Sequence, residues 1–124
     1  PAAIQAYEMS GISPEDVDLV QVHDAATIGE LQQVEALHLL PFGEAWKGTM
    51  EGRTDLTGDI PVKTDRGQLA MGHPFGASGI RMIHETVTQL RGEAGPRQVA
   101  NARIGVAQCS GAGDVTTVHI LKRG

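Results

Sequence analysis

The sequence predicts an α/β protein in which helices cover a layered mixed sheet, with the element order βαβαββ. A short apolar run at 19–22 has the length of a buried strand. Two stretches in which apolar residues recur at helical spacing follow at 27–40 and 78–91. Two strand-like runs, 103–109 and 115–122, are joined by the glycine-rich sequence SGAGD in the pattern of a hairpin. Such alternation of strands and helices is typical of layered α/β folds.

The residues ahead of the first strand have their own helical signals. Residues 2–10 have the pattern of the end of a helix that Gly11 closes. Ser13 is positioned to cap a helical turn, and Pro14 stands at the first helical position, where its missing N–H costs nothing. The first strand is therefore expected to begin close to Leu19, directly after this turn.

The first long helix is predicted at 27–40, where Thr27 and Glu30 have capping-box spacing and Pro41 follows the last residue. Its apolar side carries Ile28, Leu31, Val34 and Leu37. The segment 42–69 has no clean period, and its glycines recur among charged residues. We therefore predict an irregular excursion there, and a loop of such length inside a domain is usually functional or poorly ordered.

The second long helix is predicted at 78–91, with Gly92 as its C-terminal stop. The residues expected to face the core are Ile80, Ile83, Val87 and Leu90. The glycine-rich approach to this helix, MGHPFGASG, contains His73. Unpaired amides at a helix start favour negative charge, so a histidine held there can act as a base beside an anion.

The composition limits the class of protein. A chain of 124 residues with 40% hydrophobic and 20% charged residues predicts one globular domain, and this balance argues against disorder. A net charge of −5 with scattered basic residues argues against a nucleic-acid-binding protein. No apolar run reaches the length of a membrane span, and no signal peptide is visible. The single cysteine, Cys109, excludes an internal disulfide and suits a reducing compartment, so a cytoplasmic location is expected.

Three reactive side chains fall at the predicted ends of strands and helices. His23 follows the first strand, His73 precedes the second long helix, and Cys109 ends the strand before the glycine-rich turn. Ligands of α/β proteins normally bind at such irregular strand ends. The coincidence of the three groups predicts a site formed by His23, His73 and Cys109.

The sequence resembles the thiolase family at three ordered motifs. The stretch GHPFGASG is similar to the family's GHP-x-G-(A/S)-(S/T)-G signature, and CSGAGD stands where thiolases carry their C-terminal Cys-x-Gly motif. The stretch VQVHDAAT stands where many thiolases have Asn-Glu-Ala-Phe and where the sterol-carrier-type branch has His-Asp. The resemblance covers nearly the whole chain, but it corresponds only to the C-terminal half of a thiolase. We therefore expect residues 1–124 to be one thiolase C-terminal domain.

The resemblance implies a role for each motif residue. His73 looks like the histidine that activates the family's nucleophilic cysteine, and Cys109 looks like the acid/base cysteine that exchanges the substrate α-proton. His23 would replace the asparagine of the enolate oxyanion hole, since a ring nitrogen can donate a hydrogen bond. The candidate substrate-binding residues are Gly111, Gly76 and Ser78.

The implied activity is that of an acyl-CoA C-acyltransferase, which cleaves or forms the carbon–carbon bond of a 3-oxoacyl-CoA. Its substrates would be acyl-CoA and CoA, with no separate cofactor, no metal and no nucleic-acid partner. The family's nucleophile belongs to the N-terminal half, so a missing half or partner subunit and a homo-oligomer are expected. The isolated chain is then expected to be inactive.

Other interpretations remain open. His73 could cap a helix, Cys109 could be a small buried hydrophobic residue, and Asp24 could cap a turn beside an incidental His23. A zinc site lacks any short-spaced ligand pair. A thiolase-fold aldolase acting on 3-hydroxyacyl-CoA is expected to have lost the acid/base cysteine, whereas a non-catalytic acyl-CoA or lipid-transfer scaffold needs none. Ala112 and Asp114 interrupt the family's glycine-rich run and put substrate identity in question.

Overall fold

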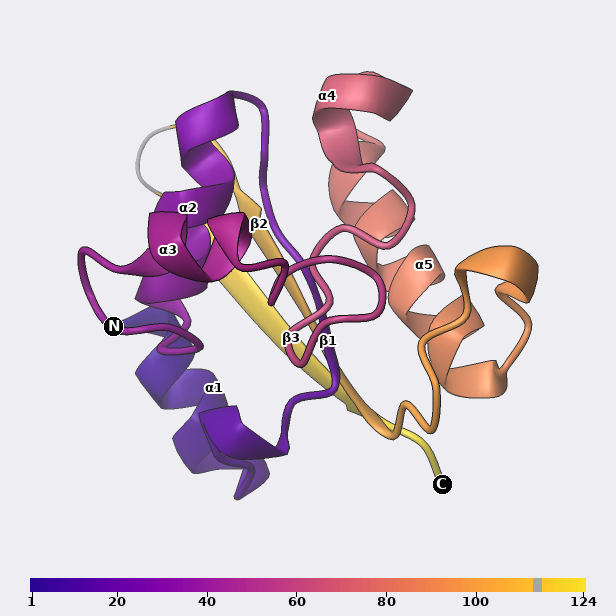
Figure 1. The fold of residues 1–124 in the computed structure, drawn as a ribbon. Helices are drawn as coiled ribbons and strands as arrows, with labels where there is room; N and C mark the ends of the chain where they lie inside the picture. The colour runs from indigo at the N-terminus through magenta and orange to yellow at the C-terminus, as the bar shows by residue number, and fades with distance from the viewer. Residues whose placement is uncertain (113–114) are drawn as a thin grey trace.

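A three-stranded mixed sheet separates two helical layers in the computed structural model, which describes residues 1–112 and 115–124 (Figure 1). The packed residues of α1, α2 and α3 lie on one face of the sheet, and α5 covers the other face. The elements in chain order are α1 (Ala2–Ser10), η1 (Pro14–Asp16), β1 (Leu19–Gln21), α2 (Thr27–Ala36), α3 (Ala45–Met50), α4 (Gly67–Met71), α5 (Ser78–Arg91), η2 (Gly95–Arg97), β2 (Ile104–Ser110) and β3 (Thr116–Lys122). The predicted α/β class is confirmed.

The sheet has the order β1-β2-β3. Strand β1 runs parallel to β2, with Leu19 opposite Gly105. Strand β3 runs antiparallel to β2 in the register that sets Ser110 opposite Thr116, so the predicted hairpin is confirmed. Residues 113–114, which include Asp114 of the glycine-rich turn, lie outside the described residues.

The second strand of the predicted βαβαββ order is reduced to a single parallel bridge between Val20 and Val62. The carbonyl of Pro61 accepts from the N–H of Val20, and the N–H of Lys63 donates to the carbonyl of Val20. Extension stops at this point because Pro61 has no N–H for a ladder and Lys63 takes a positive φ of 53°. The bridge nevertheless joins this segment to the edge of the sheet.

Helix α2 begins at Thr27 as predicted but ends at Ala36, four residues early. His38 takes a φ of 58°, a left-handed conformation that cannot continue a helix. The predicted capping box is absent, because Ala26 is the N-cap and Glu30 pairs with Lys63 instead. The capping box forms at η1, where the Asp16 carboxylate accepts from the N–H and the hydroxyl of Ser13.

The segment 42–69, predicted as irregular, contains α3 and the start of α4. The first turn of α3 is capped by a residue outside it, since the N–H of Ala45 donates to the Glu35 carboxylate at 3.0 Å. A helix of six residues is too short to be stable by itself, so its formation depends on this cap and on core contacts of Ala45. Local periodicity cannot reveal such a helix.

Helix α5 has the predicted bounds, but the predicted core face is wrong. Ile80 is 67% exposed, Ile83 and Val87 are half-buried, and only Leu90 is buried. The buried side chains are Ser78, Met82, Glu85, Thr86, Gln89 and Leu90. The polar members of this group are satisfied by hydrogen bonds, as when Gln89 accepts from the N–H of Val99, so the helix can turn them inward.

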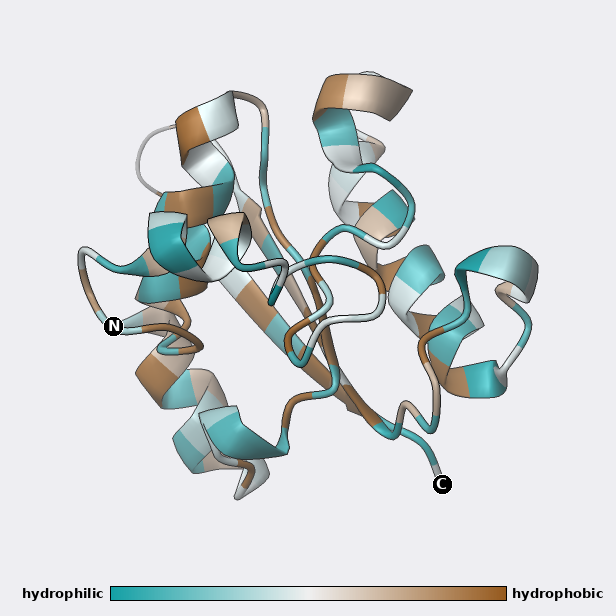
Figure 2. Ribbon diagram, viewed as in Figure 1, coloured by the Kyte–Doolittle hydropathy of each residue, from teal (hydrophilic) through white to brown (hydrophobic). Residues whose placement is uncertain are grey.

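The close contact of α5 with the sheet depends on a glycine. A Cβ built on Gly105 would lie 2.5 Å from Cγ2 of Thr86, nearer than any real carbon contact. Helix α4, by contrast, buries only its first residues, and its apolar Leu69 and Met71 are exposed (Figure 2). Apolar surface is thus left uncovered beside α5.

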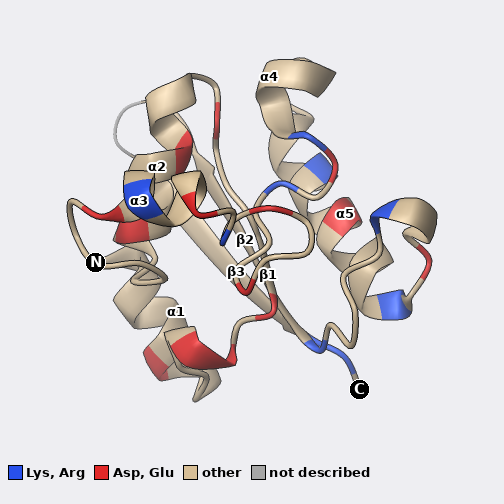
Figure 3. Cartoon of the chain, in the orientation of Figure 1, with Lys and Arg blue, Asp and Glu red and all other residues tan. Residues whose placement is uncertain are grey.

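Charges of both signs are interspersed over the chain in Figure 3. Arginines are interspersed with glutamates on and around α5 (Figure 3). Within 1–112 and 115–124, no helix combines the length and the apolar composition needed to cross a membrane.

The Gly105–Thr86 contact gives the first prediction. Gly105→Ala is expected to lower the free energy of unfolding by about 1–3 kcal/mol, because the added methyl group overpacks the contact between β2 and α5. The double variant Gly105→Ala with Thr86→Ser lacks the opposing methyl group but keeps the hydroxyl that donates to the Met82 carbonyl. It should regain most of the lost free energy of unfolding. Urea denaturation measures both values, and an equal loss in the single and double variants would contradict the contact.

Candidate active site

Two histidines from distant segments meet at one edge of the sheet. His23 directly follows β1, and His73 lies in the loop between α4 and α5. Their ring centroids are 4.9 Å apart, and the ring planes are nearly perpendicular, at 89°. Phe75 also packs edge-on against His73, with a centroid distance of 5.1 Å. The fold therefore brings together two residues that are fifty positions apart in the sequence.

Cys109 joins the two histidines from β2. Its Sγ lies 3.8 Å from Nδ1 of His23. Gly79 of α5 approaches it closely, since a Cβ at that position would lie 3.5 Å from Sγ. Cys109 and Gly79 also line a cavity of about 330 Å³, to which Phe75 and Gly76 contribute. The three reactive groups predicted from the sequence thus form one cluster, and the thiol faces a space large enough for part of a ligand.

Ser78 holds the ring of His73. Its Oγ lies 2.7 Å from Nδ1 of His73 and also donates to the carbonyl of Pro74 at 3.1 Å. A hydroxyl has one hydrogen, so when Pro74 receives it, Nδ1 must be the donor to Oγ. His73 then carries its proton on Nδ1, and its Nε2 is free to accept one. Ser78 is buried beneath the ring, so it orients His73 rather than lining the cavity.

The surroundings favour neutral forms of the other two groups. Burial lowers the pKa of His23, and the adjacent His73 lowers it further, against an opposing effect of Asp24. Burial raises the pKa of Cys109. The cluster at neutral pH is therefore a neutral imidazole beside a protonated thiol.

A buried carboxylate fixes the backbone around the cluster. Asp24 is fully buried, and its Oδ1 accepts from the N–H of Gln68 at 2.7 Å. Its Oδ2 forms an ion pair with Nζ of Lys63 at 3.2 Å. Gly67 permits this approach, since it has a φ of 70° and a Cβ there would lie 2.2 Å from Oδ2. The sequence suggested only a turn cap for Asp24, and it contained no signal for Gln68 or Lys63.

A buried glutamine supports His23 from β2. Oε1 of Gln108 accepts from the N–H of His23 at 3.0 Å, and Nε2 of Gln108 donates to Oγ of Ser110 at 2.8 Å. No motif in the sequence predicted a role for Gln108. A lone glutamine inside the apolar run IGVAQC was the available signal, because buried amides need hydrogen-bond partners.

The two candidate glycines differ in position. Gly76 is exposed, and it lines the cavity that contains Cys109. The N–H of Gly111 donates to the carbonyl of Val115 at 2.7 Å and closes the hairpin. In this conformation that amide is not free to bind a ligand, so the structure does not bring Gly111 into the cluster as a donor.

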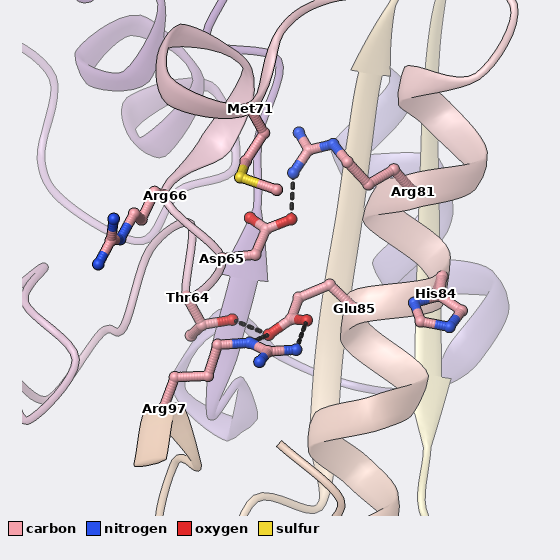
Figure 4. A pocket seen from close by; sticks show the side chains of 8 residues that line it. All are labelled: Thr64, Asp65, Arg66, Met71, Arg81, His84, Glu85 and Arg97. Carbon is pink, nitrogen blue, oxygen red and sulfur yellow. Dashed lines mark hydrogen bonds and ion pairs between the residues drawn. The ribbon is translucent and has the colours of Figure 1, made fainter. Parts of the chain in front are cut away.

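A second cavity, of about 480 Å³, lies between α5 and the segment before α4, and two ion pairs lie in its wall (Figure 4). Arg81 pairs with Asp65 across it, Arg97 pairs with Glu85, and Arg66 points away (Figure 4). These pairs hold α5 to its neighbours. Among the described residues, no group of three or more His, Cys, Asp or Glu side chains could hold a metal ion.

Comparison with known proteins identifies the family. Residues 1–123 match the family described as thiolase C-terminal domain-like. The chain belongs to this family. The resemblance expected from the three motifs is thereby confirmed, and the mixed sheet with helices on both faces agrees with it.

Several longer proteins contain a region that is similar to this thiolase-like domain. It is 45% identical over 123 residues to an acetyl-CoA acetyltransferase of Methanothermobacter thermautotrophicus. That match covers 98% of this chain and 32% of the relative. It is 38% identical to human sterol carrier protein 2, covering 99% of this chain and 22% of the relative. The benzoylsuccinyl-CoA thiolase subunit BbsB of Thauera aromatica is 42% identical over 90% of this chain. The chain thus spans a third or less of these relatives.

A solved structure gives the same result for the fold. A chain of the Ltp2-ChsH2(DUF35) aldolase matches with a TM-score of 0.85 and 27% identity, over 98% of this chain and 31% of that one. Relatives of this domain are therefore parts of larger thiolases or of enzymes with several subunits.

The buried carboxylate gives the second prediction. Asp24→Asn is expected to lower the free energy of unfolding by about 3 kcal/mol, because the amide removes the buried partner of Lys63, which then keeps only its pair with Glu30. Lys63→Met added to Asp24→Asn should lose less than the sum of the two single variants, since each single variant already breaks the Asp24–Lys63 pair. Thermal and urea denaturation of the three variants test this. Fully additive losses would contradict the ion-pair explanation.

The Glu85 carboxylate gives a prediction for pH. Burial alone would raise its pKa, but hydrogen bonds from Arg97, Gln89 and Thr64 outweigh burial and lower it below 4.5. A lowered pKa stabilises the folded chain above the unfolded value, and this contribution is lost as the pH falls through the folded pKa. The free energy of unfolding should therefore decline less steeply below about pH 4.5 in Glu85→Gln than in the wild type. The exposed Glu8→Gln is the control and should retain the wild-type decline.

Proposed function

We propose that this thiolase-like domain is the catalytic C-terminal half of an acyl-CoA C-acyltransferase that cleaves or forms the carbon–carbon bond of a 3-oxoacyl-CoA. The observation that carries the proposal is the convergence of His23, His73 and Cys109, from three separate segments, into one cluster whose thiol lines a small cavity. Such a reaction needs a base for a nucleophilic thiol, a second acid/base for a carbon acid, and donors for an enolate oxygen. The cluster offers one group for each need.

His73 is the proposed base for the nucleophile. With Ser78 accepting from Nδ1, the lone pair of Nε2 can take the proton of an attacking thiol. The resulting Nε2–H then donates to the thioester oxygen. The perpendicular ring of His23 lies beside it and can supply a second donor to an enolate oxygen.

Cys109 is the proposed acid/base for the substrate α-carbon. Its thiol stays protonated at rest because burial raises its pKa, so it can give a proton directly to a carbanion. For the opposite direction the thiolate is needed, and Nδ1 of His23 at 3.8 Å can receive the proton. A free thiol is maintained in a reducing compartment, which supports a cytoplasmic location.

The proposed enzyme needs a nucleophile from outside residues 1–124. The curated relatives are about three times as long as this chain or longer, which supports a further half or a partner subunit. Exposed apolar side chains on α4, on α5 and in the loop between them, including Met71, Phe75 and Ile80, form a surface suited to covering by that part or by a second copy. Acyl-CoA and CoA are the proposed substrates, and no other cofactor is needed.

A second candidate function is that of an aldolase subunit acting on a 3-hydroxyacyl-CoA. Its support is the structural similarity to a chain of the Ltp2-ChsH2(DUF35) aldolase. Aldol cleavage needs a base and an enolate oxyanion hole but no acyl-enzyme. Release of an aldehyde from 3-hydroxyacyl-CoA without acyl-enzyme would favour this function over acyl transfer.

The proposal predicts different defects for two variants of the enzyme assembled with its nucleophile-bearing part. His73→Ala should reduce acyl-enzyme formation by about 10²–10⁴-fold, since the nucleophile loses its base. Cys109→Ala should retain an acyl-enzyme burst but lose α-proton exchange by a similar factor, because only the carbon-acid step uses this thiol. A burst of labelled acyl-enzyme and α-deuterium exchange are measured on both.

The control is His84→Ala, because His84 is exposed on α5 and belongs to neither step. It should match the wild type in both assays. Normal deuterium exchange in Cys109→Ala would contradict the assignment and would leave Cys109 as a small buried side chain.

A further inference from the structure

Two side chains compete for one nitrogen of His23. Nδ1 of His23 lies 3.4 Å from Nε2 of Gln68 and 3.8 Å from Sγ of Cys109. An amide NH₂ can only donate, and a thiol S–H is a weak donor. The amide NH₂ of Gln68 therefore requires a bare lone pair on Nδ1, which leaves the ring proton on Nε2 and makes that lone pair the acceptor for the Cys109 thiol.

We propose that Gln68 is a positioning residue that keeps His23 in the Nε2–H tautomer and restrains transfer of the Cys109 proton to Nδ1. Gln68 does not need to touch a substrate for this purpose. It sets which ring nitrogen donates and how readily the neighbouring thiol ionises.

The position of Gln68 is fixed by the residue that follows His23. The N–H of Gln68 donates to Oδ1 of the buried Asp24, and Gly67 supplies the left-handed turn that allows this approach. The Gln68 side chain is itself only 3% exposed. One carboxylate therefore holds the backbone beside His23 and the amide that contacts the His23 ring. A flexible surface glutamine would have no such fixed geometry.

The proton transfer that Gln68 restrains is balanced within the cluster. The S–H bond of Cys109 breaks, an N–H bond forms at Nδ1 of His23, and a thiolate beside an imidazolium results with no change in total charge. The Gln68 amide opposes this step, because its N–H groups already occupy the lone pair. The ionisable groups that face the pair are His73, which adjoins the His23 ring, Asp24, which is paired with Lys63, and His119, which lines the Cys109 cavity.

The first test needs no substitution at Gln68. Imidazole ¹⁵N NMR shifts distinguish the two neutral tautomers, and the His23 signals can be assigned by their loss in His23→Asn. The Nε2–H tautomer is expected at neutral pH. A proton on Nδ1 would overturn the proposal, because the amide oxygen of Gln68 would then be the group that faces the ring.

The second test measures ionisation of Cys109, the only cysteine of the chain. The pH dependence of its alkylation by iodoacetamide reports its pKa. Gln68→Leu removes the competing donor, so the pKa should fall by about half to one unit, the size expected for one modest hydrogen bond. Gln68→Glu should raise it, because a carboxylate repels the thiolate and favours a proton on Nδ1.

The matched control is Gln32→Leu, the same substitution at an exposed residue of α2, and it should leave the Cys109 pKa unchanged. If Gln68→Leu and Gln68→Glu both fold and both keep the wild-type pKa of Cys109, the proposal is also overturned. The use of this tautomer in catalysis rests on the proposed acyl transfer, but both readouts are independent of turnover. A wrong tautomer assignment for His23 can therefore be told apart from a wrong proposed reaction.

Discussion

The buried carboxylate of Asp24 is the interaction on which the candidate site depends. It follows His23 at the end of β1, binds the backbone of Gln68 at the start of α4, and pairs with Lys63 beside the sheet edge. A fully buried charge is tolerated only when it is paired and hydrogen-bonded, so these contacts are obligatory for this fold. They tie the loop that leads to His73 to the strand that ends in His23.

The second constraint is the depth at which α5 lies on the sheet. Gly105 allows Thr86 to approach β2, and one end of the same helix then brings Gly79 to Cys109. Ser78, the first residue of α5, holds the ring of His73. Helix α5 therefore positions both proposed acid/base groups, one through its first turn and one through its packing against β2.

Local patterns in the sequence were sufficient for some of this arrangement. Helix α5 and the β2–β3 hairpin follow from short-range periodicity and glycine positions, and the three reactive residues stand at element ends where ligands normally bind. The face of α5 was predicted wrongly, because Gln89 and Glu85 become favourable core residues only after Val99, Thr64 and Arg97 supply their partners. The cap of α3 by Glu35 and the Asp24–Gln68 contact also depend on segments that meet only in the folded chain.

The apolar residues of α5 that are exposed, and do not face the core as predicted, indicate how the domain is used. Polar side chains of α5 are buried, whereas Ile80 of α5, Met71 of α4 and Phe75, which packs against His73, remain exposed. Exposed apolar surface is costly in water unless another surface covers it. Apolar cover would also exclude water and strengthen the hydrogen bonds that His73 and His23 offer to an oxyanion. The exposed apolar face of α5 is thus suited to enclosing a reaction centre between this domain and the part that supplies the nucleophile.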